Sequence, residues 1–343
     1  MLWRESRLSR LRNCGRITHG GDGGNVRARK KEDVVHYSGL QSCGSIWACP
    51  VCSAKIRNGR AEEISAAAAA WDEAGNTVVM LTLTFPHDLG MRLAPLLVLL
   101  ADGFRAVISG RPWLRVRDQL SIEGSIRSVE VTHGVAGWHP HAHVLLFARG
   151  ELRAEGLAEL GLYVRGRWAR WITGQGYRLP HETHGADLMI CRSAEEAGLY
   201  MAKTQDGRST GNEMARGDMK QGREGSRTPF EILDDFRWTG DVEDLALWHE
   251  YETATKGHQC ITWSKGLREI TGVAEVTDEQ LAEEEVGGED VAVIPAEVWA
   301  GIVKIPGLDA ALLGACERSG LAGMNKLLAR HGLGPCLPPA VDT

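Results

Sequence analysis

The sequence predicts an α+β protein: a central antiparallel sheet flanked by helices, with a cysteine-bearing segment before this core and a helical region after it. Runs of β-branched and apolar residues alternate with longer runs of good helix formers. Two strand-like runs follow one another across a short glycine-bearing turn, as in an antiparallel hairpin. At 343 residues the chain is long enough for two or three packed units.

Four strands are expected in the middle of the chain, at residues 77–85, 126–132, 141–148 and 186–191. Pro86 ends the first strand because proline cannot donate to a β-ladder. The second and third strands form the hairpin, which turns at 133–138.

Helices are expected at residues 55–74, 93–108, 151–171, 193–203, 229–255 and 295–331. Pro95 lies in the first turn of its helix, where a missing N–H costs little. Ser193 followed by Glu196 predicts a capping box. The remaining segments are expected to be a loop with a short hairpin over the first forty residues, a polar loop at 207–227 and an acidic linker at 275–290.

The net charge of −6 is distributed unevenly along the chain. Residues 1–60 contain twelve Lys and Arg against four Asp and Glu, whereas residues 271–343 contain four against twelve. This asymmetry predicts a basic N-terminal arm that faces nucleic acid and an acidic region with another role. Ordinary solvated surfaces are the alternative interpretation.

No segment predicts a membrane span. The longest apolar stretch, 93–101, is far shorter than the roughly 20 residues that a spanning helix needs, and the basic N-terminus lacks an apolar signal region. We therefore expect a soluble, cytoplasmic protein without a membrane partner.

Three of the eight cysteines, Cys43, Cys49 and Cys52, lie within ten positions. No signal peptide indicates an oxidising compartment, so metal binding is favoured over disulfides. The Cys-Pro-Val-Cys turn directs two thiolates at one ion, and Cys43 and Cys14 supply the other two ligands of a tetrahedral, structural Zn²⁺ site.

Other assignments of these cysteines are weaker. His36 or His19 could replace Cys14 as a ligand, and a redox pair lacks the βαβ pattern that accompanies it. The dispersed cysteines are expected to be small buried hydrophobic residues or ordinary thiols; they are Cys191, Cys260, Cys316 and Cys336.

The strongest single feature is the pair His141 and His143, two positions apart in a predicted strand and therefore on one face. Glu130 in the partner strand has apolar neighbours on both sides, which predicts that it faces the histidines across the hairpin. Two imidazoles and a carboxylate with open coordination positions suit Mg²⁺ or Mn²⁺ acting on phosphate oxygens. A solvent-facing Glu130 is the alternative.

A second candidate group lies on the helix expected at 193–203. Helical spacing places Glu196, Tyr200 and Lys203 on one stripe. In this arrangement Tyr200 would attack phosphorus, Lys203 would offset the developing charge, and Glu196 would activate a water or a 3′ hydroxyl. Without the histidine pair, three ordinary surface residues would be the better interpretation.

Together these motifs resemble the rolling-circle replication initiator (Rep) proteins of small plasmids, within the HUH endonuclease superfamily. The resemblance covers about residues 10–270 and rests on six segments: CGSIWACPVC at 43–52, LTLTFPH at 81–87, WHPHAHVLL at 138–146, YMAK at 200–203, RTPFEIL at 227–233 and TWSKGLR at 262–268.

The resemblance implies an HUH fold, with the histidines on a central antiparallel sheet and the tyrosine helix beside it. It implies nicking of single-stranded origin DNA by Tyr200, which leaves a 5′ phosphotyrosine and a free 3′ hydroxyl, with Glu196 acting in termination. One tyrosine matches the plasmid initiators and departs from phage-type initiators, which use two. His87 matches the first motif and is expected either to scaffold the metal site or to bind the metal.

Three segments follow from this interpretation: residues 1–60 as a basic arm with the zinc site, 61–270 as the HUH nicking and joining domain, and 271–343 as an acidic linker with a helical region. The last segment is a candidate contact for host helicase or DNA polymerase, or for self-association into a homo-oligomer. Tryptophans such as Trp47, Trp138 and Trp263 could stack on unpaired bases or belong to the core.

Three other functions are compatible with parts of this pattern. An HUH transposase would use the same chemistry. A zinc-dependent DNA-binding regulator without catalysis would leave the histidine pair and Tyr200 unexplained. A metallohydrolase of small molecules would not need the basic arm.

Overall fold

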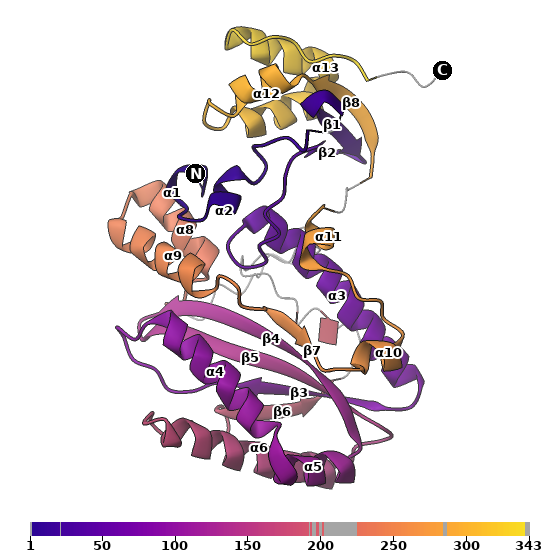
Figure 1. The fold of residues 1–343 in the computed structure, drawn as a ribbon, viewed down its shortest axis with the longest axis vertical. Coiled ribbons are helices and arrows are strands. Elements are labelled where there is room, and N and C mark those ends of the chain that lie inside the picture. Colours follow the sequence, from indigo (N-terminus) through magenta and orange to yellow (C-terminus); the bar gives the residue numbers. More distant parts are fainter. Residues whose placement is uncertain are drawn as a thin grey trace. The chain divides into compact units, whose positions relative to one another are not determined.

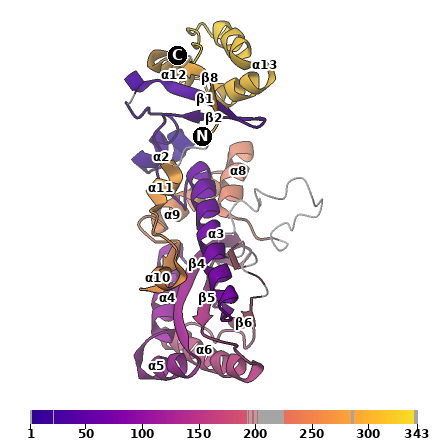
Figure 2. The same ribbon diagram turned by 90° about the vertical axis from the view of Figure 1, so that its right-hand side faces the viewer.

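The computed structural model describes residues 2–20, 22–191, 193, 197–198, 201, 225–283 and 287–339 (Figure 1, Figure 2). The chain forms two compact units: a central unit, Ile46–Thr277, and a terminal unit made of Met1–Ser45 and Asp278–Thr343. The N-terminal and C-terminal segments, expected to be separate, thus share one unit. The functional division into three segments stays a prediction.

The central unit is built on a five-stranded antiparallel sheet with strand order β6-β3-β5-β4-β7, which confirms the expected antiparallel core. The strands are β3 (Thr77–Leu83), β4 (Ile122–Gly134), β5 (Gly137–Ala148), β6 (Ala186–Ile190) and β7 (Ile261–Trp263). β4 and β5 form the expected hairpin. Its turn is shorter than expected because Gly137, at φ 86°, permits a tight reversal.

Helices cover the two faces of this sheet (Figure 2). They are α3 (Pro50–Glu73), α4 (Leu93–Val107), α5 (Gly110–Gln119), α6 (Ala154–Gly174), α8 (Pro229–Thr239), α9 (Val242–Ala254) and α10 (Leu267–Thr271). On one face, Trp71 of α3 packs in a core cluster with Leu145 and Phe147 of β5. The alternate residues Val144 and Leu146 are also buried, so the sheet is covered on both faces.

One predicted helix begins earlier than expected, and two other predicted segments lie largely outside the described residues. α3 begins five residues earlier than the helix predicted at 55–74, because Cys49 occupies the N-cap and Pro50 the first helical position. The expected helix 193–203 lies largely outside the described residues, although Ala197, Gly198 and Met201 are helical. Residues 202–224, most of the predicted polar loop, also lie outside them.

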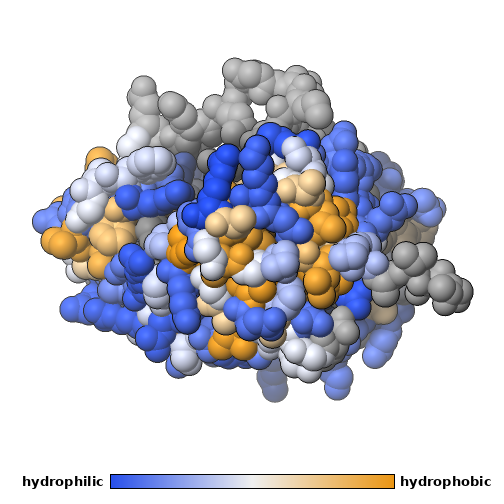
Figure 3. Space-filling model, turned by 90° about the horizontal axis from the view of Figure 1, so that it is seen from above, coloured by the Kyte–Doolittle hydropathy of each residue, from blue (hydrophilic) through white to orange (hydrophobic). Residues whose placement is uncertain are grey.

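The terminal unit contains a three-stranded antiparallel sheet in the order β2-β1-β8. Its elements are α1 (Leu2–Glu5), α2 (Ser9–Asn13), η1 (Asp22–Gly24), β1 (Val26–Lys31), β2 (Val34–Ser38), α11 (Asp278–Glu283), β8 (Glu289–Ile294), α12 (Ala296–Ile302) and α13 (Leu308–Arg330). Val26, Ile294, Trp299 and Leu312 are fully or almost fully buried in its core. Figure 3, seen from above relative to Figure 1, shows hydrophobic residues gathered among hydrophilic ones.

The oppositely charged ends of the chain meet in this sheet. Asp290 of β8 forms ion pairs with Arg27 and Arg29 of β1, and its Oδ1 lies 3.1 Å from Arg29 Nε. Lys30 lies opposite Glu289 in the register. The expectation of a separate basic arm and a separate acidic linker is therefore wrong for β1 and β8, whose opposite charges favour strand pairing.

Among the described residues, no single helix is long and apolar enough to cross a membrane. α4 and α5 meet that criterion only as a pair, and they are bent by 61° at the break between them.

Substitution of Asp290 tests the coupling between the two chain ends. Asp290→Asn removes the negative charge that pairs with Arg27 and Arg29, so we expect the terminal unit to lose about 1–2 kcal/mol of stability. Asp33→Asn is the matched control, because its ion pair with Lys30 is long, at 3.7 Å, and the Asp33 side chain is fully exposed. Hydrogen exchange of the β1 and β8 amides measures both variants. Equal protection in the two would contradict the role of Asp290.

Candidate metal centres

Glu130, His141 and His143 converge on one face of the β4–β5 hairpin. Glu130 lies directly across from His141 in the register, and His143 follows two positions later on the same face. Glu130 Oε2 is 3.2 Å from His141 Nε2 and 3.5 Å from His143 Nε2. One ligand atom from each residue lies within 4.8 Å of the others, a spacing that one metal ion could bridge.

The environment of Glu130 keeps its carboxyl group ionised. Burial alone would raise its pKa, but hydrogen bonds and charge from His141 and His143 hold the pKa well below the usual range. Its strand neighbours Val129 and Val131 are buried on the opposite face. The carboxylate is thus directed at the imidazoles rather than at solvent, and the three groups form an oxygen and nitrogen donor set suited to a divalent cation.

Outer contacts fix the orientation of both imidazoles. Thr82 Oγ1 lies 3.1 Å from His143 Nδ1, and His141 Nδ1 lies 3.5 Å from the carbonyl oxygen of His139. With Nδ1 of each ring engaged in these contacts, Nε2 is the atom directed at the Glu130 carboxylate. Thr82 belongs to the LTLT segment, and its contribution had not been predicted.

A third imidazole lies beside this group. His139 precedes His141 by two positions, and their ring centroids are 5.2 Å apart. His87 Nε2 lies 2.7 Å from His139 Nδ1, and its Nδ1 donates to the Ala136 carbonyl oxygen at 2.9 Å. Among the described residues, neither His87 nor His139 belongs to the group of three. The spacing His-Pro-His-Ala-His was the available signal for His139.

The sheet face that carries the histidines continues into a hydrophobic core. Leu145 and Phe147 follow His143 on this face, and Ala197 and Met201 are buried with them. Gly198 approaches α3 so closely that a Cβ there would lie 2.7 Å from the Ala61 carbonyl oxygen. The candidate residues Glu196, Tyr200 and Lys203 lie outside the described residues.

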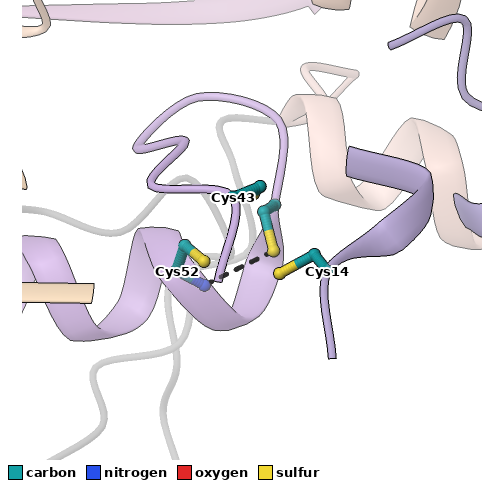
Figure 4. A group of neighbouring side chains, drawn as sticks. Cys14, Cys43 and Cys52 are labelled. Carbon is teal, nitrogen blue, oxygen red and sulfur yellow. Dashed lines mark hydrogen bonds between the residues drawn. The ribbon is translucent and has the colours of Figure 1, made fainter. Parts of the chain in front are cut away.

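Cys14, Cys43, Cys49 and Cys52 form the second cluster (Figure 4), with sulfur atoms within 4.8 Å of one another. Cys49 caps α3, and the Cys52 backbone N–H donates to its sulfur at 3.5 Å. Cys14 is half-buried and the other three are buried. Four thiolates about 2.3 Å from a central ion would fit this spacing, so the donor set suits a tetrahedral metal.

The proposed substitutes for Cys14 and the dispersed cysteines lie elsewhere. Among the described residues, His19 and His36 are not members of the cluster. Cys260, Cys316 and Cys336 are buried, and burial raises the pKa of the Cys336 thiol to about 11. Cys316 and Cys336 pack as small hydrophobic groups in the core of the terminal unit, as expected, whereas Cys191 is only half-buried.

The tryptophans expected either to stack on bases or to belong to the core differ in exposure. Trp47 and Trp138 are 4% and 2% exposed and pack around Tyr251, so base stacking is wrong for these two. Trp263 is half-buried beneath the guanidinium of Arg268, which lies 4.1 Å from its ring centroid.

Loss of the Thr82 hydroxyl tests the metal centre. Thr82→Val removes the hydroxyl that lies 3.1 Å from His143 Nδ1, so we expect Mn²⁺ affinity to fall about 10-fold. Thr84→Val is the matched control, since its hydroxyl donates to the His184 carbonyl oxygen instead. Titration with Mn²⁺ followed by electron paramagnetic resonance measures both. Unchanged affinity in Thr82→Val, or an equal loss in Thr84→Val, would refute the orienting role.

Comparison with known proteins supplies the family. The chain is 33% identical to the protein named Protein rep of Streptomyces lividans over 316 aligned positions, covering 73% of this chain and 69% of that protein. It is 32% identical over 160 positions to the neomycin resistance protein of Streptomyces cyanogenus, covering 39% of this chain and 36% of that protein. No family model and no solved structure matches. The extent and identity of the first match show that the chain belongs to the family of plasmid Rep proteins.

Proposed function

We propose that this protein initiates rolling-circle replication of a plasmid by nicking single-stranded origin DNA as an HUH endonuclease. The observation that carries the proposal is the convergence of Glu130, His141 and His143 on one sheet face. Membership of the Rep family supports a role in initiating replication. DNA is the substrate, and the cytoplasm is the proposed location.

Glu130, His141 and His143 would hold Mg²⁺ or Mn²⁺. When bound, such an ion polarises the phosphate oxygens and makes phosphorus more electrophilic. The ionised Glu130 supplies a hard oxygen ligand, and Thr82 keeps His143 Nε2 directed at the site.

Tyr200 is the proposed nucleophile. Its phenolic oxygen gives up its proton and forms a bond to phosphorus, the bond from phosphorus to the 3′ oxygen breaks, and the leaving oxygen takes up a proton to give the 3′ hydroxyl. Lys203 would offset charge on the phosphate during this step. Support comes from the sequence neighbours Ala197 and Met201, which are buried on the sheet face that carries the histidines.

Glu196 is proposed to act in the reverse direction. It would accept a proton from a water or from the 3′ hydroxyl of a second DNA end, whose oxygen then attacks the phosphotyrosine. The bond between phosphorus and the Tyr200 oxygen breaks, and the phenol regains a proton. This step releases or rejoins the DNA and ends a round of replication.

The four cysteines would hold a structural Zn²⁺, because thiolates are soft ligands that favour this ion. Recruitment of host helicase or DNA polymerase by the region 271–343, and assembly into a homo-oligomer, stay predictions.

The tyrosine assignment is tested with labelled single-stranded origin DNA and Mg²⁺ or Mn²⁺. We expect wild type to form a protein–DNA adduct that survives denaturation, and Tyr200→Phe to form none. Tyr177→Phe is the matched control, because Tyr177 packs against Phe85 and is not one of the proposed catalytic or metal-binding residues, so the adduct should stay intact.

Two outcomes would change the assignment. No adduct or cleavage with either metal, together with specific duplex binding, would replace nicking by a zinc-dependent DNA-binding regulator. An adduct formed only on transposon ends would favour the HUH transposase.

The zinc proposal predicts one Zn²⁺ per chain in protein purified without chelators. Cys52→Ala should lose it, because a ligand is removed from the cluster, whereas Cys316→Ala removes an equally buried cysteine in the terminal core and should retain it. Metal analysis of the two purified variants measures their zinc content. Full zinc content in Cys52→Ala would overturn the assignment.

A further inference from the structure

Two arginines stack on one tryptophan near the N-terminus. The guanidinium carbons of Arg4 and Arg16 lie 4.6 and 4.3 Å from the ring centroids of Trp3. Each contact is a cation–π interaction, and together they gather two positive charges around one indole ring system. A neighbouring anion would relieve the repulsion between these charges.

Arg16 is the fixed member of this group. Its Nη2 donates to the Val303 carbonyl oxygen at 2.5 Å, and its own carbonyl oxygen accepts from Trp299 Nε1 at 2.9 Å. Burial lowers the pKa of Arg16, Asp309 raises it and Arg4 lowers it. The guanidinium is therefore held in place with one negative charge, Asp309, and one positive charge, Arg4, acting on it, and Arg4 is the exposed cation of the pair.

Other arginines of the same short segment are exposed. Arg10 and Arg12 are exposed, as is Arg4, and within the described part of the chain none of the three forms an ion pair. The arginines of β1 differ, because Asp290 neutralises Arg27 and Arg29. Within the basic N-terminal part of the chain, the positive charge left for an external partner thus lies on residues 2–16, where Glu5 is the only acid.

We infer that this α1–α2 surface binds the phosphate backbone of duplex DNA, with Arg4 and Arg16 around Trp3 as its central contact. The guanidinium groups of Arg4 and Arg16 pack on the Trp3 ring, so Trp3 is suited to positioning these cations rather than to stacking on bases. Planar guanidinium groups match phosphate oxygens through paired hydrogen bonds. A duplex presents phosphates at higher density than a single strand, and this suits several neighbouring arginines.

The inference rests on the proposed function only in taking DNA as the substrate, and it adds a binding surface distinct from the nicking residues. A full-length variant with Arg4→Ala, Arg10→Ala and Arg12→Ala tests it. Binding to a random-sequence duplex is measured by fluorescence anisotropy at several NaCl concentrations, without added Mg²⁺ or Mn²⁺. The slope of log K against log salt should become shallower by about 0.9 for each phosphate that the protein no longer neutralises, so by about 2–3 for the triple variant.

Two comparison variants make the result specific. Arg111→Ala, Arg115→Ala and Arg117→Ala remove three exposed arginines from α5, giving the same change in net charge, and should alter the slope by less than about 0.9. Replacing Arg4, Arg10 and Arg12 by lysine keeps the charge and should keep most of the slope. An unchanged slope in the α1–α2 alanine variant, or equal changes in both alanine variants, would overturn the inference.

Two further measurements separate the possibilities. Equal losses on duplex and on single-stranded oligo(dT) would replace the duplex assignment by a general backbone contact. The alanine variant should still form the Tyr200 adduct on single-stranded origin DNA. If wild type forms no adduct but its duplex binding depends on the three arginines, nicking fails while this surface stands.

Discussion

The antiparallel pairing of β4 with β5 is the constraint on which the candidate site depends. Its register sets Glu130 against His141 and leaves His143 on the same face. A slip of one residue would turn the carboxylate to the opposite face, where Val129 and Val131 are buried, and the three ligands would no longer meet. Gly137 helps to fix this register, because a Cβ there would lie 3.3 Å from the Leu89 Cα.

The rest of the central unit supports this hairpin from both faces. α3 packs its Trp71 against the continuation of the histidine face, and the first turn of the same helix carries Cys49 and Cys52. One helix thus begins in the cysteine cluster and ends on the sheet core, where Trp71 Nε1 donates to the Ala148 carbonyl oxygen at 3.0 Å. A site built on paired strands and packed helices holds its ligands more rigidly than one built on loops, and this suits a carboxylate that has to meet two imidazoles.

Local patterns in the sequence predicted the hairpin, the cysteine cluster and the convergence of Glu130, His141 and His143, because strand alternation and ligand spacing are short-range properties. Thr82 was missed because its contact with His143 joins strands 61 positions apart. The first two residues of β8, Glu289 and Asp290, were expected to belong to the acidic linker because they are charged, and the strand forms through its pairing with β1. The stripe of Glu196, Tyr200 and Lys203 remains a prediction from helical spacing.

The union of the two chain ends in one sheet has a consequence for synthesis of the protein. Arg27 and Asp290 are 263 positions apart, so β1 leaves the ribosome long before its partner β8 exists. All residues of the central unit are synthesised before β8. The edge of β1 and the apolar side chains around Val26 stay exposed until the last part of the chain has been made. Closure of so long a loop is slow, and the waiting edge is open to pairing with other chains. The arginines of β1 would oppose such pairing until the acidic strand arrives.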